Sequence, residues 1–363
     1  MKIAHVVSTF PPKIGGMGSV CYEEAMLAKR HGHEPTVFTL NYGHEPIPEY
    51  AFPVVRLSAF PRLGDAGFVP RLFNRLKDFD LVHLHYPFYG GAEWVYLAKI
   101  LKHKKYVVTY HMDAAPTDIS KKIVRTVYDW ILPKLILQNA EKIITVDAGH
   151  FSQSKFSSSI SKDKIVEIAN GVDLDIFKPA EVADPNQKKT VLFVGNLIPV
   201  KRLDILLAVM VNLTDAELLV VGGNYQEKYY KQMAIDLGVS DRVKFLGAIG
   251  NQEELAKYYN LADCVVIPSV AESFSLVAAE AMASGQIIVA SDTPVFRHRI
   301  QDGQDGFLVT HGSVENFMDK IKMVLAMSET ERKNISVAAR KKAVANYSWE
   351  KHWSKLEQVY YAI

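Results

Sequence analysis

Residues 269–285 of this 363-residue chain, S-V-A-E-S-F-S-L-V-A-A-E-A-M-A-S-G, point to an α/β fold. The apolar run at residues 263–268 before them predicts a buried strand. The stretch opens with a short polar loop and continues as Ala-rich helix formers that end at Gly285, a residue type common just after a helix. Strand, loop and helix in this order predict one unit of a parallel sheet covered by helices.

The start of this helix predicts an anion site. Ser273 or Ser275 can cap it, so the N–H groups of Phe274, Ser275 and Leu276 are expected to point out of the strand edge. A helix N-terminus at the carboxyl end of a parallel strand binds anions, and phosphate is the most common of them.

Two carboxylates, Glu272 and Glu280, flank the predicted site. A phosphate repels a carboxylate, so both side chains are expected to accept hydrogen bonds from hydroxyl groups instead. A ligand that carries phosphates and sugar hydroxyls fits this arrangement. The alternative is an ordinary helix with one capping acid and one exposed Glu, and this stretch alone leaves both interpretations open.

Apolar strands and helices alternate along the chain, with one break. Strand patterns occur at 3–8, 36–40, 54–57, 81–85, 106–110, 142–146, 190–194, 217–221, 243–246, 264–267 and 287–290. The chain is therefore predicted to form two Rossmann-like, doubly wound α/β domains, residues 1–178 and 190–346, joined by a polar linker at 179–189. Residues 347–363 predict a final helix that crosses back to the first domain. Two such domains are expected to face a central, ligand-binding cleft.

Composition excludes several classes of protein. Apolar residues make up 48% of the chain and the formal net charge is +2, so nucleic acid is not an expected partner. No apolar run has the length of a membrane span, and the start is too short in apolar residues for a signal peptide. The two distant cysteines, Cys21 and Cys264, fit a reducing compartment. We therefore expect a cytoplasmic protein.

A glycine-rich loop, Gly15-Gly16-x-Gly18, follows the first strand, where backbone can approach a phosphate closely. A nicotinamide-binding fold would have another glycine at position 21 and an acid at the end of the second strand. The chain has Cys21 and Asn41 there, which disfavours nicotinamide. A merely flexible turn is the alternative interpretation.

In the second half, Lys201 and Arg202 stand at the head of a predicted helix. Cations at this end oppose the helix dipole, so the pair favours an anionic ligand, with two solvated charges as the alternative.

Histidines occur at strand ends in the first half. His111, followed by Asp113, is predicted to face the cleft, where it can donate a hydrogen bond to a sugar hydroxyl; a structural histidine is the alternative. No spacing of Cys, His and Asp in the sequence predicts a metal site. His83 and His85 are therefore assigned to the core of the first domain or to its edge.

Basic and apolar residues interleave at 118–139. Peripheral contact with an anionic membrane, on its inner face, is therefore kept as an alternative to an ordinary packed helix.

Several of these motifs match one family. Glu272 and Glu280 stand at the spacing E-x7-E, G-N-L-I-P-V-K at 195–201 matches a donor-phosphate loop, and D-G-Q-D-G-F-L-V at 302–309 matches a strand entry. With weaker matches in P-P-K-I-G-G-M-G, Y-H-M-D and N-G-V-D, nearly the whole chain resembles the retaining glycosyltransferase family 4, which has the GT-B fold and uses nucleotide sugars.

The resemblance implies roles for the matching residues. Glu280 would hold the nucleotide ribose, and Glu272 the hydroxyls of the donor sugar. The N–H groups of Phe274, Ser275 and Leu276 would bind sugar or phosphate oxygens.

The remaining roles concern the diphosphate, the base and the reaction centre. Lys201 would neutralise the diphosphate, helped by backbone near Gly16. His111 would contact the sugar near the reaction centre, and Ile249 would contact the base through its backbone.

Two positions depart from the family. Asn196 stands where the family usually has Arg, so Arg202, where the family often has Gly, would supply the missing phosphate cation. Ser275 replaces the glycine of the family's E-x-F-G, which makes the pocket slightly smaller.

The implied reaction is a retaining transfer of a hexosyl unit from a nucleoside-diphosphate sugar, with a UDP-sugar favoured over GDP-mannose. The acceptor would be a hydroxyl of a glycan, a lipid or a small molecule. No D-x-D motif lies in a loop suited to the donor, so neither a metal nor another cofactor is expected. A GT-B-like sugar-nucleotide epimerase is one alternative, and a non-catalytic protein that binds sugar nucleotides or membrane surfaces is another.

Overall fold

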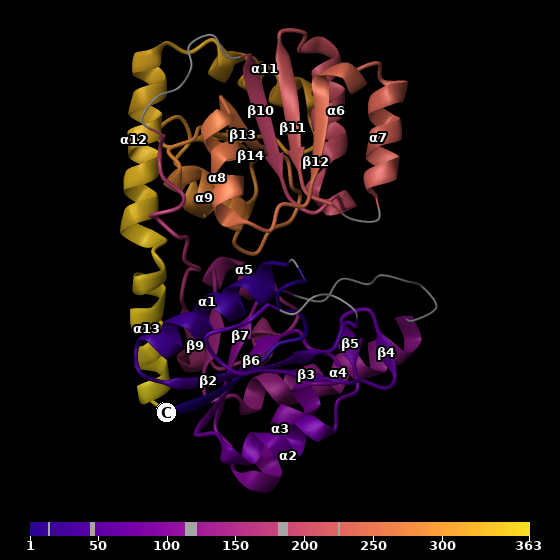
Figure 1. Cartoon of the computed structure of the whole chain (residues 1–363), viewed down its shortest axis with the longest axis vertical. Coiled ribbons are helices and arrows are strands. Elements are labelled where there is room, and N and C mark those ends of the chain that lie inside the picture. Colours follow the sequence, from indigo (N-terminus) through magenta and orange to yellow (C-terminus); the bar gives the residue numbers. More distant parts are fainter. Residues whose placement is uncertain (14, 44–47, 113–121, 181–187, 224–225) are drawn as a thin grey trace. The chain divides into compact units, whose positions relative to one another are not determined.

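The computed structural model describes residues 1–363 except 14, 44–47, 113–121, 181–187 and 224–225, and the chain forms two compact units (Figure 1). Unit 1 comprises Met1–Asn170 and Trp349–Ile363, and unit 2 comprises Gly171–Ser348. Each unit has its own parallel sheet and its own apolar core. The predicted fold class, two Rossmann-like α/β domains, is confirmed.

A seven-stranded parallel sheet forms the centre of unit 1, in the order β3-β2-β1-β6-β7-β8-β9. Its strands are β1 (Lys2–Val6), β2 (Glu34–Leu40), β3 (Val54–Leu57), β6 (Leu81–Tyr86), β7 (Tyr106–Tyr110), β8 (Ile143–Thr145) and β9 (Ile165–Glu167). Strands β6 and β7 are buried at every position, as expected for a sheet with helices on both faces. A short antiparallel hairpin, β4 (Arg62–Leu63) with β5 (Ala66–Gly67), is separate from this sheet, and no pattern in the sequence predicts it.

The helices of unit 1 come from both ends of the chain. They are α1 (Gly16–Arg30), α2 (Arg71–Arg75), α3 (Ala92–Lys102), α4 (Lys122–Asn139), α5 (Ala148–Ser152) and α13 (Trp349–Tyr361). The last of these packs into unit 1 because Trp353, Leu356 and Tyr360 are buried in one apolar cluster with Ile3 and Val107. The C-terminal helix is thus part of the first unit's core.

Unit 2 has a six-stranded parallel sheet in the order β12-β11-β10-β13-β14-β15. Its strands are β10 (Lys189–Val194), β11 (Ala216–Val221), β12 (Val243–Gly247), β13 (Cys264–Ile267), β14 (Ile288–Ser291) and β15 (Phe307–Val309). Its helices are α6 (Leu203–Asn212), α7 (Glu227–Asp236), α8 (Gln252–Leu261), α9 (Leu276–Ala283), α10 (Pro294–Arg299), α11 (Val314–Leu325) and α12 (Glu329–Asn346). The strand order reverses between β10 and β13, and parallel sheets bind ligands at the carboxyl ends of strands that flank such a reversal.

The first unit ends at Asn170, before the predicted boundary at residue 178. The segment that follows it is held by unit 2. The Arg340 guanidinium donates to the carbonyl oxygens of Leu174 (3.1 Å) and Phe177 (2.6 Å), and the Asn260 amide donates to that of Lys178 (3.0 Å). These side-chain bonds to backbone have no signature in the composition of the segment.

Parts of three predicted features lie outside the described residues. They are 181–187 of the linker, Asp113, and the basic segment at 118–139, of which 118–121 and the side chains up to 130 are not described. Within the described ranges, no helix combines the length and the apolar character that crossing a membrane requires.

Candidate active site

Helix α9 begins at a capped terminus in the loop after β13. Ser275 is the N-cap, and its hydroxyl accepts a hydrogen bond from the Ala278 N–H (3.4 Å). The N–H groups of Leu276 and Val277 lie in the first turn, where a helix offers them no internal acceptor. Of the two serines predicted as caps, the structure uses Ser275, and the helix terminus therefore presents backbone donors to the end of β13.

Ser275 adopts a left-handed backbone conformation, with φ of 66°. Glycine reaches this region without a steric cost, whereas other residues pay roughly 1–2 kcal/mol. This geometry gives a physical reason for the glycine that the resembled family often has here. It also shows that serine can form the turn, at the cost of local strain.

The Lys201 ammonium and the Glu272 carboxylate form an ion pair, with 2.6 Å between Nζ and Oε1. Lys201 ends a 3₁₀ turn, Pro199–Lys201, after β10, and Glu272 lies in the loop after β13. The N–H of Val270 donates to the Val200 carbonyl oxygen (3.0 Å), which ties the two loops together. Two residues that the sequence assigned to different parts of a donor are thus direct neighbours, beside the helix terminus.

The second predicted cation, Arg202, also has an acidic partner. Arg202 has a left-handed backbone (φ 54°) and donates through Nε and Nη2 to both carboxylate oxygens of Asp204 (3.0 and 2.8 Å). This bidentate pair raises the pKa of the guanidinium and holds its charge at the start of α6. Asn196 is exposed in the loop after β10. Each predicted cation thus has an acidic partner, and the partner of Lys201 is the one that lies in the loop before α9.

Close backbone packing shapes the loop after β10. Gly222, at the end of β11, lies so near the Gly195 carbonyl oxygen that any side chain at position 222 would collide with it. The Gly195 N–H donates to the Val221 carbonyl oxygen (2.9 Å), and the Leu197 N–H donates to that of Gly223 (3.2 Å). The pair Gly222-Gly223 after a strand was the signal in the sequence that could have identified this second glycine turn.

Glu280 lies one turn into α9 and is half-buried. Burial raises the pKa of its carboxyl to about 7, and a hydrogen bond from the Tyr259 hydroxyl to Oε2 (2.7 Å) acts in the opposite direction. Tyr259, on α8, is fully buried, and burial together with the Glu280 charge raises its own pKa. Sequence reasoning missed Tyr259, because nothing in its local pattern distinguishes it from an ordinary core aromatic.

Phe274 and Ile249 were predicted to bind the donor through their backbone. The Phe274 side chain is 2% exposed, packs edge-on against Tyr347 and lies under the Arg299 guanidinium (4.5 Å), so it belongs to the core. Ile249 is half-buried in the loop that follows β12.

In unit 1 the glycine loop forms the first turn of α1. The helix starts at Gly16, with Gly15 as its N-cap. Gly18 is required by packing, since a Cβ there would lie 2.8 Å from the Thr9 carbonyl oxygen, whereas a Cβ at Gly15 would meet no atom within 4 Å. The loop therefore combines one packing glycine, Gly18, with an exposed glycine, Gly16, at the first position of the helix.

His111 follows β7 at its carboxyl end, as predicted, and its side chain is 6% exposed. Its Nε2 lies 3.2 Å from Nδ1 of His85, and the two rings stack. Burial lowers the pKa of His111 to about 3, so its imidazole is neutral at physiological pH. A neutral imidazole can donate one hydrogen bond through its single N–H, but it carries no positive charge.

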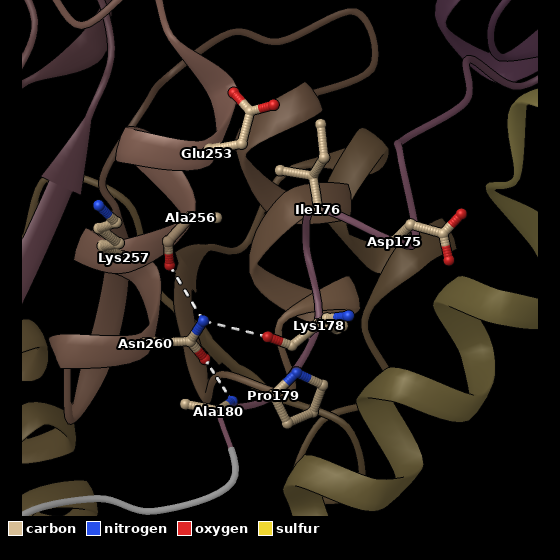
Figure 2. A pocket seen from close by; sticks show the side chains of 9 residues that line it. All are labelled: Asp175, Ile176, Lys178, Pro179, Ala180, Glu253, Ala256, Lys257 and Asn260. Carbon is tan, nitrogen blue, oxygen red and sulfur yellow. Dashed lines mark hydrogen bonds between the residues drawn. The ribbon is translucent and has the colours of Figure 1, made fainter.

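A shallow surface pocket of about 390 Å³ lies in unit 2 beside α8 (Figure 2). It is lined by Asp175, Lys178, Glu253 and Lys257, among others, and none of the predicted site residues is on its wall. Figure 2 shows the Asn260 amide between backbone atoms of the segment that follows Gly171. The pocket therefore lies where that segment packs against α8, and no residue of α9 lines it.

Two family models match the chain almost from end to end. Residues 14–176 match Glycosyltransferase Family 4, and residues 176–342 match Glycosyl transferases group 1. Together with the two Rossmann-like units, these matches define a glycosyltransferase of the GT-B fold. The chain belongs to glycosyltransferase family 4, as its motifs predicted.

Relatives and solved structures agree with this assignment. Phosphatidyl-myo-inositol mannosyltransferase of Mycobacterium leprae is 29% identical over 95% of this chain and 92% of its own. D-inositol 3-phosphate glycosyltransferase of Mycolicibacterium smegmatis is 31% identical over 75% of this chain and 64% of its own. Sucrose-phosphate synthase of Thermosynechococcus elongatus has the same fold, with a TM-score of 0.83 over 99% of this chain and 98% of that chain, at 23% identity.

Proposed function

We propose that the chain is a retaining glycosyltransferase that moves a hexosyl unit from a nucleoside-diphosphate sugar, UDP-linked in preference to GDP-mannose, to a hydroxyl group. The observation that supports this most is the Lys201–Glu272 pair beside the Ser275-capped terminus of α9. It brings a cation, a carboxylate and backbone donors to the carboxyl ends of β10 and β13. A diphosphate with a sugar attached needs these three kinds of partner.

Each residue has a part in the proposed mechanism. Lys201 and the N–H groups at the start of α9 stabilise the charge that develops on the leaving diphosphate, without a metal. Glu272 orients the hydroxyls of the transferred sugar, and Glu280 accepts from the ribose. In unit 1, His111 donates to the sugar from a neutral imidazole.

The anomeric configuration is retained if the acceptor hydroxyl attacks the sugar on the same face from which the diphosphate leaves. The bond between the anomeric carbon and the phosphate oxygen breaks, and a bond to the acceptor oxygen forms on the same side. The acceptor's proton passes to the leaving phosphate oxygen, so atoms and charge balance without a protein nucleophile.

For the acceptor, we propose a polyol of the inositol class as the first to test. The two relatives named above carry phosphatidyl-myo-inositol and D-inositol 3-phosphate in their names, and both are hydroxyl-rich rings that bear a phosphate. Two buried free cysteines fit reaction in the cytoplasm, with peripheral contact at the inner membrane face if the acceptor is a lipid.

A thermal-shift panel of UDP, GDP, ADP and their sugars tests the donor. A nucleotide at a hundred times its dissociation constant stabilises the protein by roughly 2.7 kcal/mol, which such a panel detects easily. The stabilising sugar nucleotide is then incubated with and without an inositol phosphate, and the products are analysed by NMR. We expect a glycoside with the donor's anomeric configuration, formed only with acceptor.

Three other results would count against the proposal. An inverted glycoside would exclude retention. An epimer formed from the donor alone would indicate an epimerase, and binding without turnover of any acceptor tried would indicate a non-catalytic protein.

A further inference from the structure

A cluster of buried histidines lies in unit 1. His5 on β1 and His83 on β6 are partners in the parallel register, and His85 follows two residues later on the same face of β6. Glu24 of α1 faces all three, and all four side chains are fully buried. His5 and Glu24 were absent from the sequence predictions, although a histidine on the first strand and an H-x-H on another were the signal.

The inner atoms of the cluster have the spacing of metal ligands. His5 Nδ1 lies 3.3 Å from His85 Nε2, and Glu24 Oε2 lies 3.3 Å from His83 Nδ1 and 3.6 Å from His85 Nε2. One ligand atom from each of the four lies within 4.8 Å of the others. Tetrahedral zinc, with bonds of about 2.0–2.1 Å, separates its ligand atoms by about 3.3–3.4 Å.

The outer atoms are held in the orientation that metal binding requires. His83 Nε2 lies 2.6 Å from the Thr109 hydroxyl, and His85 Nδ1 lies 3.2 Å from His111 Nε2. With a proton on each of these outer nitrogens, the inner nitrogens carry a lone pair. That of His83 Nδ1 faces the Tyr360 hydroxyl (2.7 Å), so a metal ion would take the place of this hydrogen bond. Histidines that ligate metals typically donate their other N–H to a second group in this way.

The carboxylate is oriented from the opposite side. Glu24 Oε1 lies 3.1 Å from Nε2 of His352 on α13, and His352 Nδ1 donates to the Ala169 carbonyl oxygen (2.8 Å). Within the described part of the chain, Glu24 Oε2 has no hydrogen-bond partner. A fully buried carboxylate oxygen without one is costly, and a cation would remove that cost.

We propose that His5, His83, His85 and Glu24 bind one divalent transition-metal ion, with zinc as the best match to three imidazoles and one carboxylate. The ion is structural: it joins β1, β6 and α1, and through His352 it supports α13. It is separate from sugar transfer, which needs no metal in the proposed mechanism. Because the four ligands are fully buried, the ion enters during folding.

The test begins with wild-type protein purified without a metal-affinity column or a histidine tag. Elemental analysis should find about one zinc per chain after dialysis, and an anomalous map at the zinc edge should place it among these four residues. Prolonged treatment with 1,10-phenanthroline should lower Tm, and added zinc should restore it.

Variants assign the ligands. Glu24→Gln and His5→Gln should each reduce bound zinc at least tenfold. The exposed His311→Gln should leave it unchanged, and so should Tyr360→Phe, which removes only a hydroxyl 2.7 Å from His83 Nδ1. These two controls distinguish the cluster from surface binding and from general damage to the core.

Three results would overturn the proposal. The first is wild-type protein with less than about a tenth of an equivalent of any transition metal and no Tm response to zinc. The second is zinc bound only at surface histidines, and the third is the same zinc content in the ligand variants as in the wild type. If the ligand variants fail to fold, the zinc content of the wild-type protein and the anomalous map still test the proposal.

Discussion

Glu272 in unit 2 and Glu24 in unit 1 both face nitrogen-bearing side chains, but their surroundings differ. The Glu272 side chain is 10% exposed and its partner Lys201 is 23% exposed, whereas Glu24 and its histidine partners are sealed from solvent. A pair that water reaches can exchange one partner for a ligand at small cost. A sealed carboxylate needs permanent compensation. Exposure therefore separates a group available for chemistry from one that holds the fold.

The largest effect is expected on catalysis at Glu272. Glu272→Gln should lower the transfer rate at least a hundredfold, by analogy with the loss of other transition-state hydrogen bonds. UDP should bind as tightly as before or more tightly, because Lys201 loses a competing carboxylate. Steady-state kinetics and calorimetric titration measure the two effects.

Glu217→Gln is the matched control. Glu217 pairs with Lys244 at 2.7 Å in the same unit. A similar loss of rate in this variant, or normal turnover in Glu272→Gln, would contradict the role assigned to Glu272.

Glu24 has no direct role in the proposed catalysis, so its substitution is expected to lower stability. Glu24→Ala should lower the free energy of unfolding by roughly 3 kcal/mol, because a buried charge network loses a member. Glu23→Ala, one residue earlier and half-buried, should cost less than about 1 kcal/mol. Urea unfolding measures both, and equal losses would show that burial does not separate the two positions.

The raised pKa of Glu280 predicts that the free energy of unfolding depends on pH, with an effect of intermediate size. Its folded pKa of about 7 lies above the ordinary value of 4.5, so its stabilising contribution is complete below about pH 4.5 and is lost as the pH rises through 7. Relative to Glu280→Gln, the wild type should lose roughly 2 kcal/mol between pH 5 and pH 8. A stability difference that stays constant over this range would mean that the carboxyl titrates normally.

The smallest effect is expected at Ser275. Ser275→Gly should raise stability by up to about 1 kcal/mol, since it relieves the left-handed conformation and costs only a few tenths in capping. Ser275→Ala keeps the strain and loses the cap, so it should lower stability by about 1 kcal/mol. Thermal unfolding of both variants should show opposite signs; the same sign in both would remove the argument from backbone strain.

Much of the fold was predictable because its strands and helices are strongly patterned. The predicted bounds of β13 are those of the structure, and the final helix, Trp349–Tyr361, lies within the predicted range 347–363. The hairpin β4–β5 was not predictable, because strands of two residues are too short to show an alternating pattern. Unit 1 ends at Asn170 and not at the predicted residue 178, and the side-chain bonds to backbone that hold the segment between them, such as those of Arg340, depend on the folded chain.

The sequence named candidate residues for the site but not the pairs that they form. The loops of Lys201 and Glu272 follow strands β10 and β13, which are adjacent in the sheet but far apart in sequence. The same holds for His5 and His83, on β1 and β6. Contacts between strands that are not consecutive require the strand order, and that order is visible only in the fold.

The transfer rate of Lys201→Ala compared with Lys244→Ala tests the proposed role of the Lys201–Glu272 pair most directly. The two lysines form ion pairs of nearly equal length, 2.6 and 2.7 Å, in the same unit, but only the partner of Lys201 lies in the loop before α9. We predict that Lys201→Ala loses at least a hundredfold in rate while Lys244→Ala stays within about twofold of the wild type. Equal rates in the two variants would contradict the assignment of the donor phosphates to Lys201.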